Sequence, residues 1–241
     1  MPLTRRGFVA TALLSLPRLA AQPSAGRKLK VIITGGHPGD PEYGCGGTAA
    51  RYADQGHDVV LVYLNHGEKN CPAAADDPGA TVRTAEDKSA CEILKTRPLF
   101  AGQCDGHAVV DESHYREFRK LIDAERPDLL FTHWPIDGHR DHRAISMLAY
   151  DAWLAGGKQF ALYYYEVSDG EDTLMFPPTD FVDITAVESR KRAACYAHAS
   201  QAPDKFYALQ NQVTRFRGLE SGYAQAEAFV RHSQSRSGTL P

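Results

Sequence analysis

The chain lacks the features that mark several common classes of protein. Its 27 Lys and Arg residues do not exceed its 30 Asp and Glu residues and form no run longer than three residues, so the sequence predicts no nucleic-acid-binding surface. It contains no internal repeat, no low-complexity segment and no apolar run long enough for a permanent membrane-spanning helix. What remains, with 43% hydrophobic and 24% charged residues, is typical of a globular domain.

Cysteine is sparse, and its spacing excludes familiar motifs. No two cysteines have the Cys-x-x-Cys spacing, which disfavours a zinc ribbon or a redox motif. The five are Cys45, Cys71, Cys91, Cys104 and Cys195. Because their number is odd, at least one thiol stays free or pairs with another molecule. One or two disulfides are compatible with an exported protein, but the sequence does not give their connectivity.

The first 24 residues differ from the rest and predict an export signal. Arg5 and Arg6 precede an apolar run, Gly7 to Leu16, and small residues follow at Ala20 and Ala21. The paired arginines resemble a twin-arginine signal. A cytoplasmic tail that contains two arginines by chance is the alternative. We therefore expect an exported, periplasmic or extracellular protein whose residues 25–241 form one domain.

The order of predicted elements favours an α/β fold. Short apolar, β-branched runs predict strands at residues 28–35, 58–64, 99–102, 128–132, 160–167 and 181–184. Helical patterns occupy residues 48–55, 81–95, 113–124, 142–154, 186–198 and 221–231. This alternation predicts a Rossmann-like three-layer sandwich, in which helices cover both faces of a mostly parallel sheet.

In such a sheet the functional site lies beyond the carboxyl ends of the strands, which here follow Thr34, Leu64, Gly102 and Thr132. Two of these positions are rich in imidazole and carboxylate groups, at residues 36–42 and 133–143. Either segment alone is compatible with turn formation or a solvated histidine. Together, at neighbouring strand ends, they predict a metal site, because these groups are the ligands that a catalytic zinc ion prefers.

The two segments also resemble a known family. The pattern H-P-x-D followed by P-E-x-G-C-G-G, and later P-x-D-x-H-x-D-H, is similar to the LmbE/PIG-L family of zinc-dependent N-acetylglucosaminyl deacetylases. The similarity extends from about residue 30 to residue 231. Arg83-x-x-Glu86 matches a weaker motif of that family. An LmbE-like fold with one Zn²⁺ per chain is therefore expected.

The resemblance assigns roles to individual residues. It implies that the zinc ligands are His37, Asp40 and His142. It implies that His139 protonates the leaving amine and stabilises the oxyanion, and that Asp141 orients His139. Arg83 matches a substrate-contacting arginine, and we expect Glu42 to contact substrate as well.

One position departs from the family. The usual motif is H-P-D-D, and its first aspartate is the general base, but here that position is Gly39. A nearby carboxylate, Glu42 or Asp137, is one candidate replacement, and we include Asp137 among the expected catalytic residues. Alternatively His139 acts first as base and then as acid. In the third explanation the site binds metal and ligand without turnover.

These residues lead to two competing functions. The first is a zinc-dependent hydrolase that removes an acetyl group from the amide nitrogen of an N-acetylated amino sugar or glycoconjugate. The second is a non-catalytic zinc- and sugar-binding protein, which Gly39 favours. A dinucleotide-binding role is disfavoured because residues 44–47 lack the G-x-G-x-x-G spacing. Iron and cobalt accept the same ligands as zinc, and the sequence predicts no oligomeric state.

Overall fold

A computed structural model describes residues 27–68, 70–71, 77–167 and 172–241, so the predicted export signal lies outside the described residues. Within them the strands are β1 (Lys30–Gly35), β2 (Asp58–Tyr63), β3 (Arg97–Phe100), β4 (Leu129–His133), β5 (Ala161–Tyr165), β6 (Asp180–Asp183) and β7 (Ala226–Arg231). The α-helices are α1 (Asp40–Asp54), α2 (Pro78–Leu94), α3 (Glu112–Glu125), α4 (Arg140–Ala155), α5 (Glu188–Ala197) and α6 (Pro203–Ser221). A short 3₁₀ helix, η1 (Ala199–Gln201), separates α5 from α6.

The strands form one sheet in the order β3-β2-β1-β4-β5-β7-β6. Strands β1 to β5 are parallel to their neighbours, whereas β7 runs antiparallel to both β5 and β6. The chain moves outward from β1 to β3 and then returns to β4 on the other side of β1. The switch point between β1 and β4 is where such sheets bind ligands. The predicted mostly parallel fold is confirmed.

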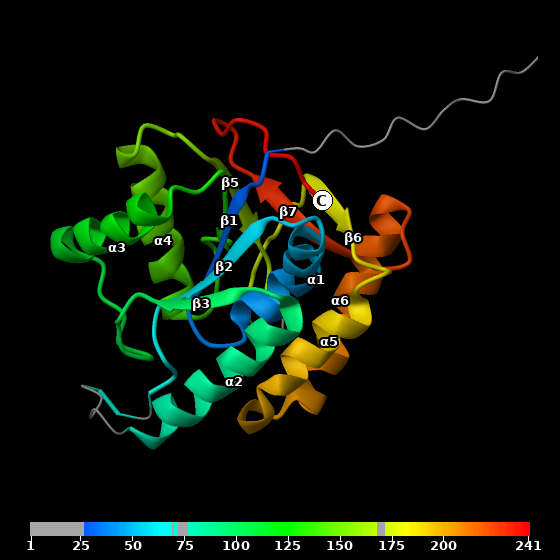
Figure 1. Cartoon of the computed structure of the whole chain (residues 1–241), viewed down its shortest axis with the longest axis horizontal. Helices are drawn as coiled ribbons and strands as arrows, with labels where there is room; N and C mark the ends of the chain where they lie inside the picture. Colours follow the sequence, from blue (N-terminus) through cyan, green and yellow to red (C-terminus); the bar gives the residue numbers. More distant parts are fainter. Residues whose placement is uncertain (1–26, 69, 72–76, 168–171) are drawn as a thin grey trace, which may run out of the picture.

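Helices cover both faces of the sheet (Figure 1). Helices α3 and α4 pack on one face, and α1, α2 and α5 pack on the other with α6 beside α5. Alternate residues of one strand therefore enter two different cores: Tyr163 and Tyr165 belong to the α1 side, and Tyr164 belongs to the α4 side. All three tyrosines are buried, which agrees with the strand predicted at residues 160–167.

The glycine-rich first half of α1 allows that helix to approach its neighbours closely. A Cβ atom on Gly44 would lie 2.3 Å from Cδ2 of Tyr165. The helix is also tied to β7, because the carboxylate of Glu227 accepts hydrogen bonds from the backbone N–H groups of Gly47 (2.8 Å) and Thr48 (2.7 Å). These contacts fix the first turn of α1, which carries part of the candidate site.

The C-terminal region corrects the sequence prediction. A helix was expected over residues 221–231, but α6 ends at Ser221 and residues 226–231 form β7. This segment is inserted between β5 and β6, and its first four residues are buried. The pairing with two strands outweighs the helical preference of its alanine and glutamate residues, as tertiary context commonly does. Pro203 starts α6 directly after Ala202, whose φ of 49° ends η1.

The structure also resolves the cysteine pairing. Cys71 and Cys104 form a disulfide with a sequence separation of 33 residues, and Cys45, Cys91 and Cys195 are buried free thiols. Among the described helices, no helix has the length and apolarity that a membrane span requires.

Candidate metal centre

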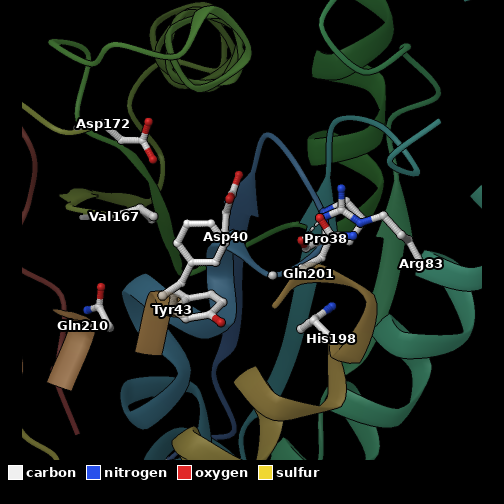
Figure 2. A pocket seen from close by; sticks show the side chains of 11 residues that line it. Pro38, Asp40, Tyr43, Arg83, Val167, Asp172, His198, Gln201 and Gln210 are labelled. Atoms are coloured by element: carbon white, nitrogen blue, oxygen red, sulfur yellow. Dashed lines mark hydrogen bonds between the residues drawn. The ribbon is translucent and has the colours of Figure 1, made fainter. Parts of the chain in front are cut away.

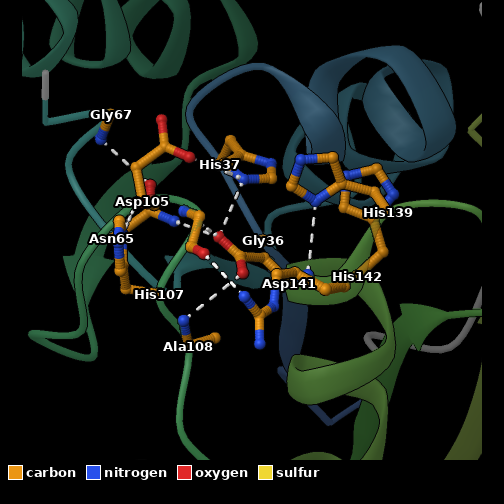
Figure 3. Close-up of polar contacts among 12 residues, drawn as sticks. Gly36, His37, Asn65, Gly67, Asp105, His107, Ala108, His139, Asp141 and His142 are labelled. Atoms are coloured by element: carbon orange, nitrogen blue, oxygen red, sulfur yellow. Dashed lines mark hydrogen bonds and ion pairs between the residues drawn. The ribbon is translucent and has the colours of Figure 1, made fainter.

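The carboxyl ends of four parallel strands deliver polar side chains to one place. His37 follows β1, Asn65 follows β2, Asp105 follows β3, and His133 is the last residue of β4. Figure 3 shows three of these side chains, those of His37, Asn65 and Asp105, around the carboxylate of Asp141 from the first turn of α4. The site is therefore built at the topological switch point, as the fold class requires.

The carboxylate of Asp40 is the centre of the imidazole cluster. Its Oδ2 atom lies 3.3 Å from His37 Nδ1, 3.2 Å from His142 Nε2 and 3.2 Å from His133 Nε2. The same oxygen accepts a hydrogen bond from the backbone N–H of His37 at 2.8 Å. Two ligands of a tetrahedral zinc ion are about 3.3 Å apart when each lies about 2.0–2.1 Å from the metal. The separations of Asp40 Oδ2 from His37 and from His142 each suit such an ion, and so does that from His133; ligand atoms of Asp40, His133 and His142 all lie within 4.8 Å of one another.

Asp137 fixes the ring of His142. Its Oδ1 atom lies 3.0 Å from His142 Nδ1 and also accepts a hydrogen bond from the backbone N–H of His139 at 2.8 Å. Its Oδ2 atom accepts a hydrogen bond from the hydroxyl of Thr173 at 3.0 Å. Both oxygens of Asp137 are therefore engaged in contacts. Because Asp137 binds Nδ1 of His142, the other ring nitrogen, Nε2, points toward Asp40. Metal-ligating histidines are commonly oriented by such a carboxylate. This placement differs from the general-base role expected of Asp137.

His133 belongs to the cluster, although no role was predicted for it. It has no exposed surface, and its ring stacks on that of His142 with centroids 4.0 Å apart and an interplanar angle of 10°. Burial, with the neighbouring His142, lowers the pKa of His133 to about 4, so this imidazole is neutral at physiological pH. One feature of the sequence could have identified His133 as a site residue: it directly follows the fourth predicted strand, at the edge of the sheet where the site is expected.

Asp141 holds His37 rather than His139. Its Oδ2 atom lies 3.2 Å from His37 Nε2 and accepts a hydrogen bond from the backbone N–H of Gly106 at 2.7 Å (Figure 3). Asp105 adds a second carboxylate, with Oδ1 3.2 Å from the same nitrogen of His37. Asp141 is hydrogen-bonded to the ring of His139 through its backbone N–H, not through its carboxylate. The sequence did not identify Asp105, although it lies just beyond the end of the third predicted strand.

His139 is the partly exposed imidazole of the group. It is the N-cap of α4, and its Nδ1 atom accepts a hydrogen bond from the backbone N–H of Asp141 at 3.2 Å. A neutral His139 in this arrangement carries its proton on Nε2, which is then a hydrogen-bond donor. Its ring centroid lies 4.5 Å from that of His37 and 4.8 Å from that of His142. Burial and the two neighbouring histidines lower the pKa of His139.

The electrostatics of the cluster favour a cation. Burial alone would lower the pKa of His142, but Asp40 and Asp137 raise it to about 9. Asp40 likewise raises the pKa of His37 well above its usual value, against the effect of burial. The pKa of Asp40 is held well below its usual range by His142 and His37, although burial opposes this. The carboxylates therefore favour positive charge at His37 and His142. A divalent cation bound to the neutral imidazoles would supply that charge in place of the two protons.

Gly39 forms the wall of an adjoining cleft. This residue has a φ of 106°, and a Cβ atom there would lie 3.8 Å from the rings of His198 and Tyr43. Figure 2 shows Tyr43 and Asp40 in the middle of the cleft, which has a volume of about 130 Å³. An aspartate at position 39 would therefore have a strained backbone, and its Cβ atom would lie next to the ring of His198.

The two residues expected to contact substrate differ in position. Arg83 lines the cleft, donates a hydrogen bond from Nη2 to the carbonyl of Pro38 at 2.6 Å, and places Nη1 3.9 Å from Oδ2 of Asp105. Glu42 has no exposed surface and does not line the cleft. Its Oε1 atom instead accepts a hydrogen bond from the hydroxyl of Tyr63 at 2.6 Å. Glu42 therefore faces the helices behind the cleft, away from the position that a substrate would take.

Comparisons with known proteins agree with this geometry. The sequence profile of the family described as PIG-L, GlcNAc-PI de-N-acetylase, matches residues 32–153, which is just over half of the chain. The chain is 29% identical over 219 residues to the diacetylchitobiose deacetylase of Thermococcus kodakarensis, and the alignment covers 82% of this chain and 81% of that protein.

Solved structures with a similar fold catalyse more than one reaction. The N,N'-diacetylchitobiose deacetylase of Pyrococcus horikoshii is 22% identical with a TM-score of 0.72, over 86% of this chain and 84% of that chain. The 4-carboxy-2-hydroxymuconate hydratase GalB of Pseudomonas putida is 20% identical with a TM-score of 0.73, over 88% of this chain and 100% of that chain. The fold alone therefore does not decide the reaction, and the residues of the site must do so.

Proposed function

Because this chain belongs to the PIG-L family of GlcNAc-PI de-N-acetylases, we propose that it is a zinc-dependent hydrolase that removes an acetyl group from an N-acetylated amino sugar. The observation that supports this most strongly is the arrangement around Asp40. One carboxylate oxygen of Asp40 lies 3.2–3.3 Å from His37 Nδ1 and from His142 Nε2, on two segments about a hundred residues apart. The relatives with deacetylase activity support the choice of reaction.

The ligand set fits zinc and defines what a bound ion would supply. His37, Asp40 and His142 would hold the ion, and an open position would remain for water or substrate. When bound, the ion would polarise the acetyl carbonyl and lower the pKa of a coordinated water molecule toward about 7. Asp137 keeps His142 in place for this role, and Asp141 and Asp105 do the same for His37.

His139 acts on the substrate in this proposal. Its Nδ1 atom is occupied by the backbone N–H of Asp141, so Nε2 presents a proton. That N–H is suited to stabilise, as a hydrogen-bond donor, the negative charge that develops on the carbonyl oxygen. Water adds its oxygen to the carbonyl carbon, and the proton that it gives up is the one that the leaving nitrogen gains as the C–N bond breaks. The products are acetate and a free amine.

Position 39 has no carboxylate to act as the base. Neither of the two candidate replacements, Asp137 and Glu42, has a carboxylate oxygen placed to contact the substrate. Asp137 uses both oxygens on neighbouring groups, and Glu42 is buried behind the cleft. We therefore propose that deprotonation of the water depends mainly on the metal. Turnover should then be slower than in relatives with the complete motif, because a positioned base contributes roughly 10²–10⁴-fold to the rate.

The cleft beside the metal centre would bind the sugar. Arg83 lines this cleft, and its Nη1 atom lies 3.9 Å from Oδ2 of Asp105, which lines an adjacent pocket that also contains Arg83. A guanidinium and a carboxylate together supply donors and acceptors for the hydroxyl groups of a sugar. Tyr43 forms part of the wall and offers an apolar ring face.

The test is release of acetate from N-acetylated sugars by the chain with Zn²⁺. The panel comprises N-acetylglucosamine, N,N'-diacetylchitobiose and a lipid-linked N-acetylglucosaminide, with an N-acetylated amino acid as a control. We expect release from at least one sugar, and no release by His142→Ala. A zinc-loaded, folded protein that releases acetate from none of these sugars would contradict the proposal.

Gly39 supports one alternative, a protein that binds zinc and a sugar without turnover. Its φ of 106° favours glycine over residues with a side chain, so the backbone at this position is not suited to an aspartate base. Under this alternative, isothermal titration calorimetry detects zinc-dependent binding of an N-acetylated sugar while no acetate accumulates during the same incubation.

We also propose that the protein functions outside the cytoplasm. The pattern of residues 1–24 supports an export signal, and the Cys71–Cys104 disulfide suits an oxidising compartment. Fractionation of cells that produce the full chain tests this. We expect the protein in the periplasm or medium, and replacement of Arg5 and Arg6 by lysine should retain it in the cytoplasm.

A further inference from the structure

A second group of potential metal ligands lies behind the cleft, among helices of one face. Glu42 is the third residue of α1, Asp87 lies in the second half of α2, and His198 caps the C-terminal end of α5. One ligand atom of each residue lies within 4.8 Å of the others. We propose that Glu42, Asp87 and His198 form a second divalent-cation site, distinct from the centre around Asp40.

All three side chains are completely buried, and most of their polar atoms lack a hydrogen-bond partner. None has exposed surface. Among the described residues, no hydrogen-bond partner is found for Oε2 of Glu42, for either carboxylate oxygen of Asp87, or for either ring nitrogen of His198. Buried polar atoms in native proteins are nearly always paired, and an unpaired buried carboxylate is especially costly. Five such atoms in one place indicate a ligand.

The charge of the group indicates that this ligand is a cation. Two carboxylates lie beside one imidazole, and none of the three forms an ion pair with a lysine or arginine side chain in the described structure. The guanidinium of Arg83, whose charge acts on Asp87 to lower its pKa, donates a hydrogen bond to the carbonyl of Pro38 and lies near Asp105 rather than forming an ion pair with Asp87. A buried pair of carboxylates requires compensation by a positive charge or by a proton.

The donor set and its spacing suit a first-row divalent metal. Two carboxylate oxygens and one imidazole nitrogen are ligands that zinc, iron and manganese accept. Oε1 of Glu42 lies 3.4 Å from Nε2 of His198, close to the separation of about 3.3 Å expected of two ligands on a tetrahedral zinc ion. The hydroxyl of Tyr63, which donates a hydrogen bond to the same Oε1 at 2.6 Å, would orient the carboxylate of Glu42.

The position of the group gives the ion a structural role. Helices α1, α2 and α5 pack together on one face of the sheet (Figure 1), and the ligands lie on α1, on α2 and at the C-terminal cap of α5. An ion there would link three helices that are far apart in sequence. Because His198 also lines the cleft (Figure 2), the ion would support the part of the cleft wall that adjoins Gly39.

A proton is the competing occupant. Burial, together with the negative charge of Glu42, raises the pKa of Asp87 to about 9, so without a cation this carboxyl is protonated at neutral pH. The two occupants differ in a measurable way, since only a cation changes the number of metal ions that the chain binds.

The experiment counts metal ions. Metal-free protein is dialysed against Zn²⁺ and analysed by inductively coupled plasma mass spectrometry, with circular dichroism to confirm folding. We expect two zinc ions per wild-type chain, one in Asp87→Asn, one in His142→Ala and none in the double variant. Glu86→Gln is the matched control, because Glu86 adjoins Asp87 on α2 but binds Ser200 (Oε1 to backbone N, 2.7 Å), and it should keep two ions.

Two results would overturn the proposal. One is a single zinc ion in both the wild type and Asp87→Asn, which leaves the proton as the occupant. The other is a zinc ion retained by the double variant, which places the second ion elsewhere. His198→Gln repeats the measurement if Asp87→Asn does not fold. The wild type should also gain thermal stability on binding the second ion, and Asp87→Asn should not.

Discussion

Asp137 and His142 form a carboxylate–imidazole pair, with Oδ1 of the first 3.0 Å from Nδ1 of the second. The pair is buried, and it turns the other ring nitrogen of His142 toward Asp40. Asp137 was expected to act on the substrate, but its position makes it a positioning residue for His142, the proposed metal ligand. This reassignment changes what its substitution should do.

Asp137→Ala should weaken zinc binding at the main centre by about 10–100-fold, the usual cost of removing such a partner. Asp137→Asn should weaken it less, because its amide oxygen can still accept a hydrogen bond from His142. Competition with a chelator of known affinity measures both dissociation constants. If Asp137→Ala binds zinc as tightly as wild type but loses activity, Asp137 has a chemical role and the reassignment is wrong.

Gly39→Asp should not restore a fast deacetylase. The φ of 106° at this residue makes any side chain there cost about 1–3 kcal/mol, and the new Cβ would lie beside His198 and Tyr43. Gly39→Ala is the control, since it introduces the same strain without a carboxylate. We expect similar turnover numbers for both variants. An increase of 100-fold or more in Gly39→Asp over Gly39→Ala would show that the missing base alone limits the rate.

The Cys71–Cys104 disulfide should stabilise the loop that carries Asp105 and Gly106. Cys104 precedes these two residues directly, and they contact His37 and Asp141. For a loop of this length the chain-entropy model gives about 3–4 kcal/mol. Replacing both cysteines by serine should lower the free energy of unfolding by up to that amount and weaken zinc binding. Unfolding by urea and zinc competition measure the two effects, and an unchanged zinc affinity would show that the loop is held by other contacts.

Lys191 and Glu227 form a fully buried ion pair, with Nζ 2.6 Å from Oε1. Lys191→Met should destabilise the protein by about 3–5 kcal/mol, because Glu227 is then left buried without its cation. The double variant Lys191→Met with Glu227→Gln should be less destabilised, since no buried charge remains. Chemical denaturation compares the two. Equal stabilities of the single and double variants would show that the pair is not coupled.

The sequence was most informative where a local strand pattern could be combined with the rule that sites in parallel sheets lie at the carboxyl ends of the strands. The parallel strands were evident from short β-branched runs, and the fold rule then placed His37 and His142 at one edge of the sheet. Asp105 and Asn65 were missed because their role depends on how the loops after β2 and β3 turn inward. His133 was missed because its location at the end of a strand does not reveal which neighbours stack on it. β7 was read as a helix because its alanines and glutamate favour that state until two strands pair with it.

The most direct test of the proposed function is a zinc titration of the metal-free chain during acetate release from N,N'-diacetylchitobiose. We predict no release without metal, a rise as zinc is added up to saturation, and no release at any zinc concentration in His142→Ala. Full activity in the metal-free chain, or equal activity in wild type and His142→Ala, would contradict a reaction that depends on the centre formed by His37, Asp40 and His142.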